Sequence, residues 1–133
     1  MTVTFEPTIG RYLHLDLFGR QHRIYVEEAG HGTPLLCLHT AGADGRQYRA
    51  LMNDARVTAK HRVIAFDMPW HGKSSPPEGW HNEEYQLTSA QYTTMILEIS
   101  ADAEVMNDMT ATVASNFCKF TFRSQCCFCV DAC

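Results

Sequence analysis

The stretches LLCLHTAG (residues 35–42) and VIAFDMPWHGKS (residues 63–74) decide the fold of this 133-residue chain. Each opens with four apolar residues and then turns polar, which is typical of a parallel strand buried on both faces and followed by a loop. Earlier in the chain, residues 13–17 and 24–26 alternate apolar and polar side chains, the period of a half-buried strand. Gly19 lies between them, so we expect two antiparallel strands joined by a turn.

Two helices are expected, each beginning with a residue pair that can form a capping box. In the first, Asp44 and Gln47 form the pair, and the apolar residues that follow share one helical face: Tyr48, Leu51, Met52 and Ala55. In the second, Thr88 and Gln91 precede apolar residues at helical spacing: Tyr92, Met95, Ile96, Ile99 and Ala103. This order of elements predicts an α/β fold, in which antiparallel strands lead into a partial parallel sheet with flanking helices.

The loops after the two apolar stretches resemble loops of the α/β-hydrolase superfamily. The HTAG of residues 39–42 resembles the His-Gly-x-x-Gly oxyanion loop, with Thr40 where glycine is usual. The DMPWHGKS of residues 67–74 resembles the Asp-x-Pro-Gly-x-Gly-x-Ser loop, with Trp70 in place of the first glycine. Both motifs stand at the interval that the family shows, and the resemblance covers residues 11–104. It implies a truncated α/β-hydrolase fold, without the family's C-terminal half.

The resemblance also implies a candidate site at these loops. The oxyanion loop would consist of His39, Thr40, Ala41 and Gly42, with the Ala41 N–H stabilising a developing alkoxide and His39 holding the loop. The adjoining pocket loop would contain Asp67, Trp70, His71, Gly72 and Ser74. The implied parent activity is serine-type hydrolysis of an ester, a thioester or an activated C–C bond in a small molecule. Such relatives serve small-molecule catabolism or secondary metabolism and use no metal or cofactor.

The nucleophile of such a site is missing from the pattern, because no Gly-x-Ser-x-Gly occurs in the sequence. Ser115 lies where the nucleophile is expected, but Val113 and Phe117 stand where the strained elbow needs small residues. The acid and the histidine of the triad are not found after it. We therefore expect residues 1–104 to be the N-terminal half of a hydrolase domain. Residues 105–133 are expected to be a divergent Cys- and Phe-rich tail, of the kind that a frameshift or a retained intron produces.

Three functions stay open at this point. In the first, which we favour, the chain is a truncated and inactive hydrolase whose apolar strand at residues 35–38 has an uncovered edge that favours self-association. In the second, it is a non-catalytic module that pairs with a full-length hydrolase by strand addition. In the third, Ser115 or Ser74 serves as the nucleophile of a minimal esterase.

Charge and composition argue against several other classes. A net charge of −4 without a basic run argues against nucleic-acid binding. No apolar run approaches the roughly 20 residues of a membrane span, and no signal peptide is recognised, so a cytoplasmic protein is expected. The pair Cys126 and Cys129 lacks the second pair that a zinc knuckle needs. No metal-ligand spacing links the nearest candidate set of His39, Asp67, His71 and His81.

Overall fold

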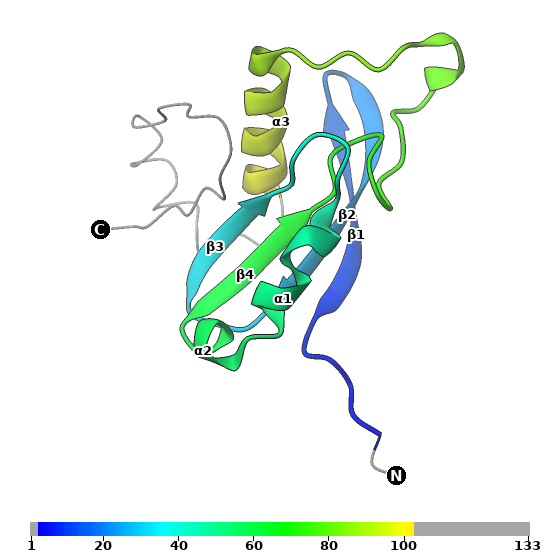
Figure 1. Cartoon of the computed structure of the whole chain (residues 1–133). Helices are drawn as coiled ribbons and strands as arrows, with labels where there is room; N and C mark the ends of the chain where they lie inside the picture. Colours follow the sequence, from blue (N-terminus) through cyan, green and yellow to red (C-terminus); the bar gives the residue numbers. More distant parts are fainter. Residues whose placement is uncertain (1–2, 103–133) are drawn as a thin grey trace.

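The computed structural model describes residues 3–102, which form a four-stranded mixed sheet with helices on both faces (Figure 1). The strands are β1 (Ile9–Leu17), β2 (Arg20–Ala29), β3 (Thr33–Leu38) and β4 (His61–Phe66), in the spatial order β1-β2-β4-β3. Strand β2 is antiparallel to both of its neighbours, whereas β3 and β4 are parallel. This arrangement confirms the predicted α/β class.

The hairpin of β1 and β2 follows from its alternating pattern. Apolar side chains from both strands point to one face of the sheet, where Leu17 and Ile24 are fully buried. Phe18 and Gly19 join the strands with φ angles of 57° and 73°. Positive φ at both positions is what a two-residue type I′ turn requires. The prediction of two antiparallel strands with a turn at Gly19 is confirmed.

The two parallel strands are covered to different extents. Strand β4 lies between β2 and β3, and its residues from Val63 to Phe66 are all buried. Among the described residues, β3 pairs with β4 alone, and Leu35, Leu36 and Leu38 are only half-buried. The prediction of full cover on both faces of residues 35–38 was therefore wrong for this part of the chain. The expected apolar edge is present there instead.

The helix expected after β3 is broken into three short pieces, which are η1 (Gly45–Tyr48), α1 (Arg49–Met52) and α2 (Ala55–Thr58). Asp44 does cap the first piece, because its carboxylate accepts a hydrogen bond from the Arg46 N–H at 3.0 Å. The Gln47 side chain does not complete the predicted box and turns toward the preceding loop. Asp54 caps a separate helix, so Ala55 starts α2 and is exposed. The prediction of one continuous helix was wrong, because a second capping residue interrupts it.

Helix α3 (Ser89–Asp102) begins where the sequence predicted. The Thr88 N–H donates to Gln91 Oε1 at 2.9 Å, and the Gln91 N–H donates to Thr88 Oγ1 at 3.2 Å, which completes the capping box. Its buried face, formed by Met95, Ile96 and Ile99, packs on the side of the sheet that carries the hairpin's apolar residues. The pieces η1 and α1 cover the opposite side (Figure 1).

A long loop, residues 67–88, connects β4 to α3 and contains the short helix η2 (Trp80–Asn82). Its early part runs along β2, because the Ser75 N–H donates to Arg23 O at 2.9 Å. Ala103 and the predicted tail of residues 105–133 lie outside the described residues. No helix within residues 3–102 is long and apolar enough to cross a membrane.

Candidate functional site

His39 joins the loops that follow β3 and β4. The residue comes directly after β3 and is buried, with 6% of its surface exposed. Its Nε2 atom accepts a hydrogen bond from the Met68 N–H at 2.9 Å, so Nδ1 carries the proton and donates to Thr40 O at 3.0 Å. The imidazole therefore links two loops that are 29 positions apart in the sequence. The role of His39 in an oxyanion loop stays a prediction.

The Ala41 N–H, the predicted oxyanion donor, is available. Ala41 and Gly42 are exposed, and no residue from 3 to 102 accepts a hydrogen bond from the Ala41 N–H. The loop around it is closed by a hydrogen bond from the Ala43 N–H to Thr40 O at 3.0 Å. Thr40 replaces the usual glycine, and its N–H and hydroxyl both donate to Gln47 Oε1, at 3.3 and 3.4 Å. The threonine therefore ties the loop to η1.

Asp67 holds the second loop from inside. Its carboxylate is buried, with Oδ1 accepting from the Gly45 N–H at 2.6 Å and Oδ2 accepting from the Lys73 N–H at 2.8 Å. A Cβ atom at residue 72 would collide with this carboxylate, and Gly72 has a φ of 50°. Only glycine fits there without strain. The role of Asp67 is thus to hold its loop and η1 in place.

Ser74 is engaged on both sides of its hydroxyl. The Oγ atom donates to Asp67 O at 2.6 Å and accepts from the Tyr25 N–H at 2.8 Å, and the residue is buried. Within residues 3–102, the Ser74 hydroxyl has no hydrogen bond to a histidine side chain. The contacts favour a bracing role for Ser74 over that of a nucleophile.

Trp70 and His71 belong to an aromatic cluster on the loop after β4. The Trp70 ring meets Trp80 edge to face, with centroids 5.2 Å apart, and lies 6.1 Å from Tyr85. The His71 ring lies between His39 and Tyr85, at centroid distances of 5.0 and 5.4 Å. Trp70 lines a cleft of about 440 Å³. No group of three metal-ligating side chains occurs within residues 3–102.

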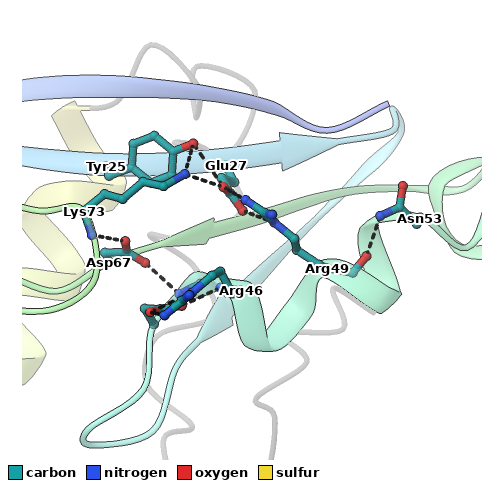
Figure 2. A network of polar contacts seen from close by, with 9 residues as sticks. Tyr25, Glu27, Arg46, Arg49, Asn53, Asp67 and Lys73 are labelled. Atoms are coloured by element: carbon teal, nitrogen blue, oxygen red, sulfur yellow. Dashed lines mark hydrogen bonds and ion pairs between the residues drawn. The ribbon is translucent and has the colours of Figure 1, made fainter. Parts of the chain in front are cut away.

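Sequence reasoning missed a buried ionic network on the α1 side of the sheet (Figure 2). Glu27 is 3% exposed and pairs with Arg49 at 2.5 Å and with Lys73 at 3.4 Å, while the Tyr25 hydroxyl donates to it at 3.0 Å. Burial raises the pKa of Glu27, but the hydrogen bonds from Arg49 and Tyr25 outweigh burial, so its pKa lies below the ordinary value. Glu27 therefore stays ionised and anchors α1 to the sheet. Glu27 continues the alternation of residues 24–26, so it lies on the polar face of the strand. Nothing in the sequence showed that α1 would cover this face.

A family model described as alpha/beta hydrolase fold matches residues 33–107. The chain belongs to the α/β-hydrolase family. One similar solved structure is the N-acyl homoserine lactonase AidH, in an E219G mutant complexed with N-hexanoyl homoserine. The identity is 28% and the TM-score 0.55, over 70% of this chain and 32% of the lactonase.

Two further hydrolases share the fold at lower identity. The Cif epoxide hydrolase from Acinetobacter nosocomialis is 22% identical, with a TM-score of 0.54 over 77% of this chain and 29% of its own. The haloalkane dehalogenase DatA from Agrobacterium tumefaciens C58 is 21% identical, with a TM-score of 0.51 over 69% of this chain and 28% of its own. The chain thus spans about a third of the length of these hydrolases. No curated protein matches it.

Family membership agrees with the positions of the two loops at the carboxyl ends of β3 and β4. The structure brings His39 and the start of the second loop into contact and places Asp67, Gly72 and Ser74 in one bracing unit. Ser115 lies outside the described residues, as do the cysteines from residue 118 onward. No serine paired with a histidine and an acid is found within residues 3–102.

Proposed function

We propose that residues 39–42 are the oxyanion loop of a serine-type hydrolase site for small-molecule substrates. One observation carries this proposal: Ala41 is exposed and its N–H has no acceptor within residues 3–102, while the buried His39 links the loop around it to the loop after β4. A fixed N–H costs little reorganisation when charge develops on a substrate oxygen, and one such donor contributes about 3–4 kcal/mol to catalysis. Placement of this donor at the carboxyl end of a parallel strand supports the same role.

An ester is the substrate class that we favour over a thioester or an activated C–C bond. The AidH lactonase, at 28% identity, is described as acting on N-acyl homoserine lactones. A lactone is a cyclic ester, and its carbonyl oxygen becomes an oxyanion when a nucleophile attacks. The other two hydrolases, below 25% identity, support only the fold.

We further propose that the 133-residue chain does not hydrolyse esters by itself. The sequence contains no Gly-x-Ser-x-Gly, and Ser74 uses its hydroxyl to brace the backbone. A serine without an adjacent base is a poor nucleophile at neutral pH. Oxyanion stabilisation alone would then have no covalent intermediate to act on.

Labelling with a fluorophosphonate probe, read by intact mass, tests this proposal. We expect no stoichiometric adduct and no hydrolysis of p-nitrophenyl acetate above that of the heat-denatured chain, while an intact serine hydrolase of the family is labelled in parallel. An adduct on one serine would contradict the proposed inactivity. Separate Ser74→Ala and Ser115→Ala variants would then show which hydroxyl reacts.

A second candidate function is that of a non-catalytic module that pairs through β3. The supporting observation is that β3 is bonded to β4 alone among residues 3–102, and its Leu35, Leu36 and Leu38 are half-buried. Such an edge can accept a strand from a second copy or from a full-length hydrolase. Sedimentation velocity and co-purification with a full-length relative test the two partners. A strictly monomeric protein that captures no relative would exclude both.

A further inference from the structure

The cleft beside Trp70 is separate from the oxyanion loop. It has a volume of about 440 Å³ and lies between the tip of the β1–β2 hairpin, the loop after β4 and the first turns of α3. None of residues 39–42 lines it. Its size falls within the range of small-molecule sites, roughly 300–1,000 Å³. The volume alone does not indicate a ligand, but three further observations do.

The first observation is backbone strain in two bulky side chains. Phe18 and Trp70 are the only residues other than glycine with positive φ within residues 3–102, at 57° and 71°. Both line this cleft, although they come from different loops. Left-handed backbone is unfavourable for large side chains, and such strain gathers at functional sites. Both angles belong to tight turns, the type I′ turn of the hairpin at Phe18 and the turn closed by the hydrogen bond from the His71 N–H to Met68 O at 2.9 Å at Trp70. Each turn has a bulky aromatic residue, and not glycine, at a position with positive φ beside the same cavity.

The second observation is an unused acceptor atom. His22 lines the cleft and is 94% buried, since only 6% of its surface is exposed. Its Nδ1 lies 2.8 Å from Arg20 O, which can only accept, so Nδ1 carries the proton and Nε2 presents a lone pair. Nε2 has no hydrogen-bond partner within residues 3–102, yet it is not among their fully enclosed unpartnered atoms. Nε2 is therefore not sealed in the interior, and His22 is one of the residues that line the cleft.

The third observation concerns the charge and the surface that a ligand would meet. The Arg20 guanidinium is occupied by Glu83 at 2.7 Å and by Glu78 O at 3.0 Å, so it offers little to an anion. Phe18 and Tyr85 are 56% and 43% exposed, so aromatic surface at the cleft remains uncovered. Burial lowers the pKa of His22, which keeps the imidazole neutral at neutral pH.

We propose that this cleft binds a neutral small molecule with a flat aromatic body and a hydroxyl or N–H donor, such as a phenol. The aromatic body would lie against Trp70 and Tyr85, and the donor would bond to His22 Nε2. This site is independent of the proposed hydrolysis, because it uses no residue of the oxyanion loop. The ligand would cover part of the exposed Phe18 side chain.

Calorimetric titration of the full chain with 2-naphthol and with 2-methoxynaphthalene tests the site. The two probes share an aromatic body, but only the first has a donor. We expect 2-naphthol to bind about 3- to 10-fold more tightly, the ratio that one neutral hydrogen bond gives. In the unchanged protein, the ¹⁵N resonance of His22 Nε2 should shift with 2-naphthol and stay in place with 2-methoxynaphthalene.

Two variants complete the test. His22→Phe removes the acceptor and should abolish the preference between the probes, whereas His14→Phe, at an exposed position on β1, should preserve it. Circular dichroism establishes that each variant is folded, and the ¹⁵N measurement stands even if His22→Phe does not fold. Equal binding of both probes, binding of neither, or an unmoved Nε2 resonance would overturn the proposal.

Discussion

Replacing His39 with alanine should strongly destabilise the fold by releasing the loop after β3. The change leaves the Met68 N–H without an acceptor in a residue that is only 3% exposed, which costs about 1–3 kcal/mol. It also removes a buried ring. Replacing a large buried side chain with alanine lowers the free energy of unfolding by about 2–5 kcal/mol, including the cost of the cavity that is left. Thr40 O loses one of its two donors, but it keeps the hydrogen bond from the Ala43 N–H, and Thr40 is exposed to water. We therefore expect the free energy of unfolding to fall by about 3–5 kcal/mol.

Urea denaturation followed by circular dichroism measures this loss, with His31→Ala as the matched control. His31 is exposed in the turn before β3, so its truncation should change the free energy of unfolding by less than about 0.5 kcal/mol. His39→Gln should fall between the two, because an amide can still accept from Met68 and donate to Thr40. If His39→Ala is no less stable than His31→Ala, the imidazole does not hold the two loops together.

Three other changes test the bracing contacts. Ser74→Ala should cost about 2–3 kcal/mol in urea denaturation, because it breaks two buried hydrogen bonds, and should leave fluorophosphonate labelling unchanged. Glu27→Gln should cost about 1–2 kcal/mol by the same measurement, because it weakens the hydrogen bonds from Arg49 and Tyr25, while the Arg49 side chain is 41% exposed and its charge stays solvated. The hydrogen bond from Arg46 lowers the pKa of Asp44 from 3.8 to about 2, so its stabilisation is present above pH 4 and is lost as the pH falls toward 2. Asp44→Asn should flatten this part of a pH-dependent unfolding profile, and an unchanged slope would contradict the stabilisation of ionised Asp44 by the Arg46 side chain.

The elements that the sequence predicted well are those whose pattern is local. The hairpin turn at Gly19 and the capping box at Thr88 need only neighbouring residues, and both are present in the structure. The prediction of one continuous helix after β3 was wrong for an equally local reason. Asp54 is itself a good N-cap, so a second helix, α2, begins directly after it. The helical spacing of the apolar residues alone does not show this break.

The candidate site could be located from the sequence but not explained by it. The positions of the two loops followed from motif and spacing, whereas the bond from Met68 to His39 depends on how β3 and β4 lie side by side. Glu27 continues the alternation of residues 24–26, but only the packing of α1 shows that it is buried and ion-paired. The unused Nε2 of His22 likewise depends on a contact with Arg20 O at the start of β2 and on the cleft that His22 lines. The expected cytoplasmic location and a role in catabolism or secondary metabolism stay predictions.

Amide hydrogen exchange, followed residue by residue by NMR, tests most directly whether the loop after β3 is held with a free donor. The Met68 N–H, bonded to a buried His39, should be protected at least about 1,000-fold relative to an unfolded chain. The Ala41 N–H, exposed and without an acceptor in the described part of the chain, should exchange within about 10-fold of the unfolded rate. Rapid exchange at Met68 would show that the two loops are not joined, and strong protection at Ala41 would show that its N–H is already occupied and cannot serve an oxyanion.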